Sequence, residues 1–499
     1  MPMVRPIIRA LLVSACFLSC FGCSSEDASG SSSPAGTGGA GNSDGSVDTG
    51  SADSSGDSAG LGGSSGTGGS TGPGGAAGVG GFDGSAGLGG SAGSGGSAGS
   101  SGGTQLPIEP VLSADPEVMA ILDGLGDNSS AILPPLHTVG DWNSVTKEYS
   151  MHVHGPRGRD YSNKAVWMPD RKRAFFCGAN HGSPHRLNDA WEFDLPSHTW
   201  VMLFAPDPNN AAGVMEIVEG DVLDGNGNVL ETVKYVQTQR GGPTHYGHTW
   251  WGLAYEPTMK AALWMNVAIG QSAADYIEKQ TGSTEGIYKG PPLWAFYPYE
   301  GRWQLILSPS PWPKIIYAGA MEYVPELGGA FWYAANWNGQ GMHVYQPGEN
   351  VWQNLSPNNG ENLYHHDQTP RTEAVMCHDR AHGVVVAQSP NHATTHYDIA
   401  SNTWTKVLNP GEDDTQSPRG HDAGTQMYYD PISQRCLLYD KVQPGSIWSY
   451  SVENKAWSRH TPNGPEAPTS KVISYFDEEH NVFVVNSGST TWVYRFRIP

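Results

Sequence analysis

The feature that most constrains the fold is an aromatic residue followed seven positions later by tryptophan, which recurs five times. The five pairs are Phe193/Trp200, Phe296/Trp303, Tyr345/Trp352, Tyr397/Trp404 and Tyr450/Trp457. Each pair ends a similar stretch of chain: two apolar segments, a loop, an aromatic-x-aromatic segment, a short polar turn and a segment led by tryptophan. Short apolar runs bounded by turns predict four β-strands in each unit.

The later tryptophans follow one another after 49, 52 and 53 residues, and a period of roughly 50 residues is typical of a propeller blade. One blade cannot bury its own faces, so blades stack around an axis. We therefore predict an all-β, six-bladed β-propeller over residues 138–499. The 103 residues between Trp200 and Trp303 leave a seventh blade open. Residues 213–242, with an Asp-Gly-Asn-Gly turn, fit a hairpin insertion better, and a short helix is expected over 272–280.

A sixth aromatic residue, Tyr494, has no tryptophan after it, because the chain ends at Pro499. An open ring would leave unpaired edges on two sheets. We therefore expect an N-terminal strand to complete the last blade. The missing tryptophan is assigned to Trp142, so that the strand around this residue closes the ring.

The segment Leu187-Asn188-Asp189-Ala190-Trp191-Glu192-Phe193-Asp194, followed by Thr199-Trp200, resembles the second half of the kelch motif. Residues 138–499 as a whole are similar to the propeller of the galactose oxidase superfamily. The Gly-Gly of that family is replaced by Cys177-Gly178 or Ala334-Ala335, so the ring resembles a divergent kelch propeller.

The first residues resemble an export signal. Arg5 and Arg9 precede an apolar run over 10–21, which is too short to span a bilayer. Residues 1–23 resemble a bacterial lipoprotein signal peptide, with Cys23 as the lipidated residue. Processing near Cys16 and an ordinary cleaved signal stay open. The expected location is the bacterial outer membrane or cell surface, with the lipid as the only membrane contact.

Residues 24–104 consist almost wholly of Gly, Ser, Ala and Thr and contain no Lys or Arg. Such a composition predicts a disordered tether with an end-to-end distance of about 50 Å. Residues 105–137 form a lead-in, in which Asp115 and Pro116 predict the start of a short helix that ends near Leu122.

Charge and cysteine content restrict the partners. The formal net charge is −21, and outside the export signal and tether 42 acidic residues face 26 basic ones, which argues against nucleic acid as a partner. Cys177, Cys377 and Cys436 are expected in three different blades, where we predict buried free thiols. No cysteine spacing indicates a metal site. We expect a monomer.

More than half of the 18 histidines fall in connections that the fold would gather at one mouth of the ring. In propellers, ligands bind between the loops that enter the innermost strands and those that leave the second strands. The histidines in these loops are His152, His154, His181, His185, His245, His248, His365, His366, His392 and His421.

Histidine, tyrosine and arginine together suit the removal of a proton next to a uronate carboxylate. Some polysaccharide lyases, including ulvan lyases, are propellers that use His and Tyr in this way, and the mouth is similar to theirs in residue types. The likeness implies His248 or His181 as base or charge neutraliser, and Tyr246 or Tyr161 as proton donor. The residues expected to bind substrate are Arg157, Arg240, Arg371, His421 and Trp337, the last by stacking on a sugar ring.

Two other functions stay open. The likeness to galactose oxidase implies copper, but the required Cys, two Tyr and two His cannot be assembled around Cys377. No cofactor is therefore predicted, although copper or zinc at His245, His248 and His421 stays open. The second alternative is a scaffold without catalysis, which binds a protein or an extracellular polysaccharide at the same mouth.

Overall fold

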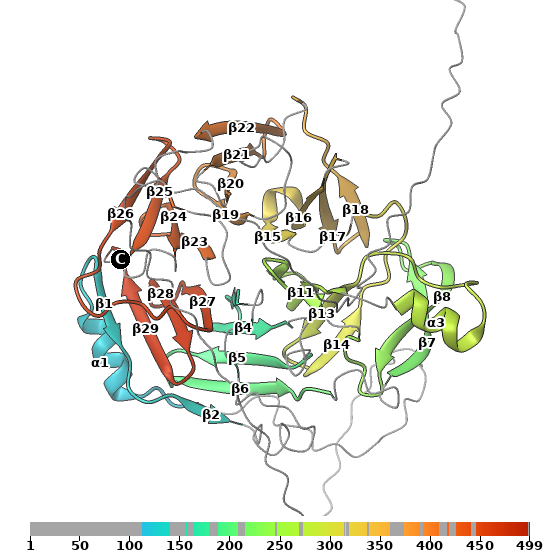
Figure 1. The fold of residues 1–499 in the computed structure, drawn as a ribbon, viewed down its shortest axis with the longest axis horizontal. Coiled ribbons are helices and arrows are strands. Elements are labelled where there is room, and N and C mark those ends of the chain that lie inside the picture. Colours follow the sequence, from blue (N-terminus) through green and yellow to red (C-terminus); the bar gives the residue numbers. More distant parts are fainter. Residues whose placement is uncertain are drawn as a thin grey trace, which may run out of the picture. The chain divides into compact units, whose positions relative to one another are not determined.

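The computed structural model describes residues 112–139, 156, 159, 163–178, 188–207, 215–244, 247–268, 273–313, 315, 319–336, 339–359, 374–389, 393–408, 417–418, 426–440, 446–497 and 499. All of them belong to the compact unit Ala98–Pro499. Their strands form six sheets of at least four strands each, arranged around an axis (Figure 1). The prediction of an all-β, six-bladed propeller is confirmed, and the described strands contain no seventh blade.

Each blade is an antiparallel sheet that runs from an innermost first strand to an outer fourth strand. Blades 1 and 2 consist of β3 (Val166–Met168), β4 (Arg173–Cys177), β5 (Ala190–Asp194), β6 (Thr199–Phe204), and β10 (Leu253–Glu256), β11 (Ala261–Met265), β13 (Leu293–Tyr297), β14 (Arg302–Leu305). Blades 3 and 4 consist of β15 (Ala320–Val324), β16 (Gly329–Asn336), β17 (Gly339–Gln346), β18 (Val351–Asn354), and β19 (Val375–Asp379), β20 (Val384–Gln388), β21 (Thr394–Asp398), β22 (Thr403–Leu408). Blades 5 and 6 consist of β23 (Gln426–Asp430), β24 (Arg435–Tyr439), β25 (Ile447–Ser451), β26 (Ala456–His460), and β27 (Val472–Asp477), β28 (Val482–Ser487), β29 (Thr490–Arg495), β1 (Ser129–Ile132). A 3-10 helix, η2 (Pro325–Leu327), follows β15.

The aromatic repeat is the contact between the third and fourth strands of a blade. Tyr397 lies opposite Trp404, with ring centroids 5.3 Å apart, and the other four pairs are equivalent. The residue two positions before each tryptophan has a left-handed backbone, such as φ 53° at Asn402, a conformation that asparagine tolerates well. Tyr397 Oη also donates to Asn402 Oδ1 at 2.9 Å. A tight turn between paired aromatic residues therefore fixes the spacing of seven.

The last blade is closed by β1, which pairs antiparallel with β29. Ser130 lies opposite Tyr494. Ser130 thus occupies the position that tryptophan takes in the other blades. Tyr494 Oη donates to Asn128 Oδ1 at 2.8 Å, and Asn128 has φ 47°, so it replaces the turn asparagine. The prediction that an N-terminal strand closes the ring is confirmed. Its assignment to Trp142 is wrong, because Ser129–Ile132 occupies that edge; Trp142 itself lies outside the described residues.

The lead-in is built into the ring. Helix α1 (Pro116–Gly124) begins as predicted, since Asp115 Oδ1 accepts the N–H of Glu117 at 2.8 Å. Its buried Val118 packs with side chains of blades 1 and 6. Strand β2 (His137–Val139) then pairs in parallel with β6 and adds a fifth strand to blade 1.

The long connection between blades 1 and 2 carries an insertion. Strands β7 (Met215–Leu223) and β8 (Val229–Thr238) form a hairpin, and helix α3 (Ala273–Thr281) lies against β8 (Figure 1). Two short strands, β9 (Gly247–His248) and β12 (Val267–Ala268), pair beside them. The predicted hairpin and helix are both confirmed.

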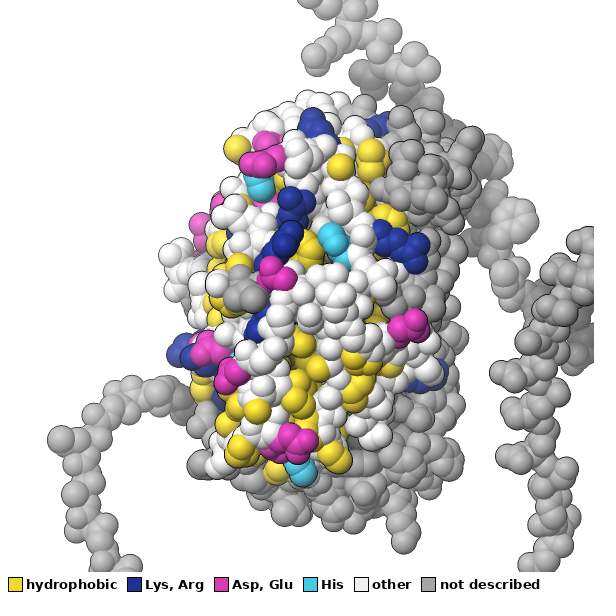
Figure 2. All heavy atoms as spheres, turned by 90° about the vertical axis from the view of Figure 1, so that its left-hand side faces the viewer, with side chains coloured by type: hydrophobic (Ala, Val, Ile, Leu, Met, Phe, Trp, Pro, Cys, Tyr) yellow, Lys and Arg dark blue, Asp and Glu magenta, His cyan; other side chains and the backbone are white. Residues whose placement is uncertain are grey.

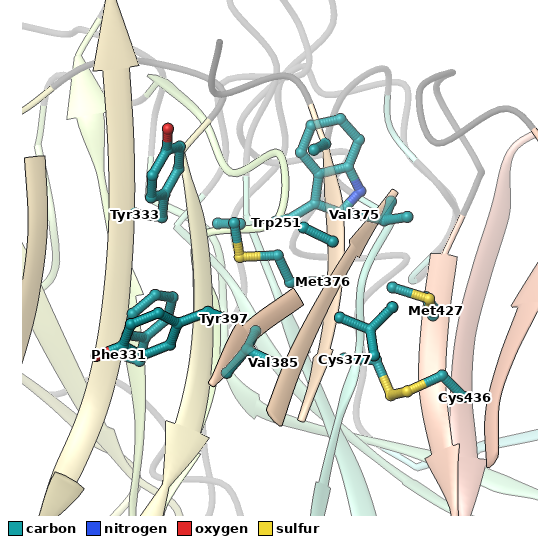
Figure 3. Close-up of a cluster of buried hydrophobic side chains, with 14 of the residues drawn as sticks. Trp251, Phe331, Tyr333, Val375, Met376, Cys377, Val385, Tyr397, Met427 and Cys436 are labelled. Atoms are coloured by element: carbon teal, nitrogen blue, oxygen red, sulfur yellow. A yellow bond between two sulfur atoms is a disulfide. The ribbon is translucent and has the colours of Figure 1, made fainter. Parts of the chain in front are cut away.

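A disulfide joins neighbouring blades. Cys377 on β19 is bonded to Cys436 on β24, with the Cα atoms 6.1 Å apart, inside the apolar core of blades 3 to 5 (Figure 3). The prediction of free thiols is wrong for this pair and holds for Cys177, which is buried and unbonded. Because 59 residues separate the two cysteines, the contact arises only when the blades stack.

We predict that Ala131→Pro destabilises the ring. Ala131 lies opposite Val493 in the closing pair, and proline removes an N–H and strains the strand. The unfolding free energy in urea should fall by more than about 1 kcal/mol, the net value of one hydrogen bond. Ala76→Pro in the glycine-rich segment is the control. Equal stability of both variants would contradict closure by β1.

We also predict that Cys436→Ser lowers the free energy of unfolding by about 2–4 kcal/mol, the usual contribution of a disulfide. A reducing agent should lower the melting temperature of the unsubstituted protein and leave that of Cys436→Ser unchanged. Cys177→Ala should keep the response to reduction. A response that persists in Cys436→Ser would show that the disulfide is not the stabilising link.

Candidate functional site

The two ends of the ring differ in construction. Connections between first and second strands, and between third and fourth strands, lie at one end because the strands alternate in direction. The turns after the first strands are uniformly tight, with a left-handed residue four positions beyond each strand: Lys172, Lys260, Gly328, Gly383, Gln434 and Asn481. Connections between second and third strands, and between blades, start and end at the opposite end, which we call the mouth. The insertion belongs to the mouth.

All nine predicted site residues belong to mouth connections by their position between strands. His181, Tyr246, Tyr161, Arg157, Trp337, Arg371 and His421 lie outside the described residues, as does Cys23. For His248 only the backbone is described, paired with Val267. Arg240 is described with its side chain. The roles assigned to these residues stay predictions.

Arg240 lies at the base of the insertion. Its guanidinium stacks on the ring of Phe204 at 4.3 Å and donates to the carbonyl of Ala205 at 2.8 Å and to Asp207 Oδ1 at 3.2 Å. Asn188 Nδ2 donates to the other oxygen of Asp207 at 2.9 Å. Arg240 thus ties the insertion to blade 1, and about a third of its side chain (36%) stays exposed.

A buried ion pair anchors the mouth side of blade 1. Arg159 donates to Asp189 Oδ2 at 2.6 Å and to the carbonyl of Gly178, and its side chain is fully buried. Trp191 Nε1 donates to the same carboxylate oxygen at 2.7 Å. Burial raises the pKa of the neighbouring Cys177 thiol, which keeps it protonated and unreactive. These residues fix the strand ends from which the mouth connections leave.

The space around the axis is crossed by a second ion pair, in which the lysine is buried and the glutamate partly buried. Lys164 precedes the first strand of blade 1. Its Nζ donates to the carbonyl of Met321 at 2.8 Å and to Glu322 Oε1 at 2.7 Å, and both acceptors belong to the first strand of blade 3. The lysine side chain is 4% exposed. Burial raises the pKa of Glu322, and the Lys164 ammonium opposes that shift.

Further polar contacts extend this crossing to blades 5 and 6. Tyr428 Oη donates to the carbonyls of Ser474 and Ala165, and Gln426 Nε2 donates to Asn163 Oδ1. We call Asn163, Lys164, Glu322, Gln426 and Tyr428 the axial cluster. It joins four blades near the mouth end of the first strands. Because its lysine and glutamate are paired, the cluster offers little free charge to a ligand.

At least seven of the eight histidines outside the mouth connections are buried or make structural contacts. His198 Nε2 lies 2.7 Å from Thr491 Oγ1, His396 Nε2 lies 2.7 Å from Tyr450 Oη, and His460 Nε2 lies 2.8 Å from Ser449 Oγ. The carboxylate-bound ones are His378 with Glu326, His382 with Asp379, and His480 with Asp477. His343 is buried in β17, and His137 lies in β2.

Sequence reasoning missed the axial cluster and the Arg159–Asp189 pair. One signal was present: Glu322 is a charged residue in the middle of the otherwise apolar run Ala320–Val324. A charge at such a position needs a partner. Its partner Lys164 is 158 residues away, so the pairing becomes visible only when the blades are closed into a ring.

No protein-family model matches the chain, and the search of characterised proteins found no match. The described residues contain no group of three or more His, Cys, Asp or Glu that could hold a metal ion. None of the described helices is long and apolar enough to cross a lipid bilayer.

We predict that stability falls as the pH drops from about 6.5 towards 4. Burial lowers the pKa of His198, His343 and His396 to about 4. The unfolded chain therefore binds more protons in this window, and each histidine adds a slope of up to about 1.4 kcal/mol per pH unit. His343→Leu should flatten the dependence between pH 7 and 5 in urea unfolding, whereas His137→Gln, at an exposed position, should not. Equal slopes in all three proteins would contradict the assignment.

Proposed function

We propose that this chain is an exported propeller that binds an anionic polysaccharide at its mouth. The observation that carries the proposal is the division of the 18 histidines. Eight lie in strands or turns outside the mouth connections, and at least seven of these are buried or bonded to neighbouring side chains. The other ten lie in the mouth connections. Burial or local bonding gives at least seven of the first group a structural role, whereas the ten of the second group share one end of the ring by their position between strands.

The residue types of the mouth suit a uronate polymer. Arginine binds a carboxylate through two parallel hydrogen bonds, and histidine carries a charge that responds to mild acid. Since the axial cluster is internally paired, attraction for an anion would come from the connections, through Arg157, Arg240 and Arg371, with His421 beside them. Trp337 would stack on a sugar ring.

Cleavage by β-elimination is the catalytic form of the proposal. His248 or His181 would accept the proton next to the carboxylate, Tyr246 or Tyr161 would protonate the leaving oxygen, and an arginine would neutralise the carboxylate. Binding alone needs only the affinity of these groups for the polymer, so binding can occur without elimination.

Two alternatives have less support. A copper oxidase of the galactose oxidase type needs a free cysteine beside a tyrosine, and Cys377 is bonded to Cys436. A nucleic acid would call for a continuous basic surface, whereas acidic and basic side chains are interspersed on the side of the ring seen in Figure 2. A protein ligand at the mouth remains the non-carbohydrate alternative.

The aromatic repeat supports grouping the ring with kelch-type propellers.

Export is part of the proposal. Disulfides persist in oxidising compartments, and the Cys377–Cys436 bond supports an extracytoplasmic location. The signal-like segment 1–23 and a lipid on Cys23 would hold the ring at the cell surface through the tether 24–104.

The test compares binding of polygalacturonate and alginate with neutral dextran by affinity electrophoresis. Retardation by the uronates should weaken with added salt, and Arg371→Ala with His421→Ala should lower the affinity about tenfold, which corresponds to about 1.4 kcal/mol. His137→Ala, outside the mouth, is the matched control. Equal retardation by dextran would refute anion binding. Absorbance near 235 nm that His248→Ala abolishes would establish elimination in addition.

A further inference from the structure

A separate cavity lies between the insertion and blade 2. Its volume is about 310 Å³, and it is lined by residues of β8, α3, β13 and the segment 288–292. A volume of this size falls at the lower end of small-molecule sites and is too small for a polysaccharide chain. The cavity therefore calls for a different ligand from the mouth.

The walls are mainly apolar and aromatic. Val236 and Ile277 belong to a small core of the insertion, and Trp294, Leu305 and Tyr235 are among the other apolar lining residues. Flat aromatic walls of this kind suit a ring-shaped ligand, which gains both burial and stacking.

The wall formed by Tyr288 is held in place. Tyr288 Oη donates to the carbonyl of Ile306 at 3.2 Å and accepts the N–H of Ser308 at 3.2 Å. A Cβ atom on Gly290 would lie 2.2 Å from that oxygen, so glycine is required for the ring to lie against the backbone. The cavity wall is thus shaped by specific contacts.

The charge of the lining is positive. Lys234 and Lys289 line the cavity, and its described lining contains no acidic side chain. Neither lysine forms an ion pair with any residue in the described part of the chain. The backbone of Lys234 is fixed, since its carbonyl accepts the N–H of Tyr288 at 2.9 Å and its N–H donates to Gly286. Lys289 is exposed and marks the side that opens to solvent.

We infer that this cavity binds a small aromatic monoanion of the aryl carboxylate or aryl sulfonate class. The ring would lie among Tyr235, Tyr288 and Trp294, with the anionic group towards Lys234 and Lys289. Apolar burial supplies most of the affinity, and the two ammonium groups select the anion over a neutral analogue. The inference does not depend on the function of the mouth.

The test titrates the full-length protein with 8-anilinonaphthalene-1-sulfonate and with N-phenyl-1-naphthylamine, which has the same ring body without the sulfonate. Binding of the anion should saturate at one site, raise its fluorescence and be displaced by 2-naphthoate. The double variant Lys234→Gln/Lys289→Gln should lower the affinity for the anionic probe about tenfold, which is the contribution of about one charge-assisted hydrogen bond. Its affinity for the neutral probe should stay unchanged. Lys279→Gln on α3 removes a charge outside the cavity and is the matched control.

Ile277→Trp should fill the cavity and abolish binding of both probes. If that variant loses stability, Ala274→Phe fills the same space from α3, and its melting temperature shows whether the fold is kept. Probe binding that survives both substitutions would overturn the inference, as would a double lysine variant that weakens both probes equally. Absence of any saturable binding would also overturn it.

Discussion

Pairing of β1 with β29 is the interaction on which the ring depends. It joins residues 366 positions apart, as in the contact between Tyr494 and Asn128. Backbone hydrogen bonds also cross this junction: the N–H of Asn128 donates to the carbonyl of Phe496, and the N–H of Ser130 donates to the carbonyl of Asn463. Arg495 donates to the carbonyl of Leu125 at 2.6 Å. The entropic cost of closing a loop rises only slowly with loop length. The few contacts at this junction therefore suffice to hold the two ends of the ring together.

Closure also brings blade 1 beside blade 6, and much of the mouth depends on that neighbourhood. Lys164 forms a parallel bridge to Ser474, from which position its side chain reaches Glu322. A charge pair in the interior is weak as a source of stability but costly to break, because each ion left alone would be desolvated without compensation. The pair therefore favours one arrangement of the innermost strands. This gives the mouth a fixed base, while its connections differ in length from blade to blade.

The sequence predicted what local spacing controls and missed what depends on which blades meet. The Tyr397/Trp404 spacing contains a whole turn and its pairing, so the blades could be counted from it. Trp142 was a misleading marker, because the closing strand keeps the turn asparagine, Asn128, and replaces the tryptophan by Ser130. No local sequence pattern indicated the Cys377–Cys436 disulfide, because its two cysteines belong to different blades. For the candidate site, the order of the strands is enough to predict at which end of the ring Arg371 and His421 belong. The direction of their side chains could not be predicted, because the connections that carry them do not share the sequence repeat of the blades.

Arg240 shows how the mouth and the insertion are linked. Its partner Asp207 also accepts from Asn188, and the carbonyl of Asn188 accepts the indole N–H of Trp303, the repeat tryptophan of blade 2, at 3.1 Å. One hydrogen-bonded chain thus connects blade 1, blade 2 and the base of the hairpin that carries β8. A polymer carboxylate that approaches Arg240 has to compete with Asp207 for the guanidinium. The exposed third of the side chain can still meet a ligand, but a substitution at Arg240 would disturb the hairpin and its cavity together with the mouth. Arg371 and His421 belong to other connections by their position between strands, so substitutions there test the proposed ligand recognition apart from this structural role of Arg240.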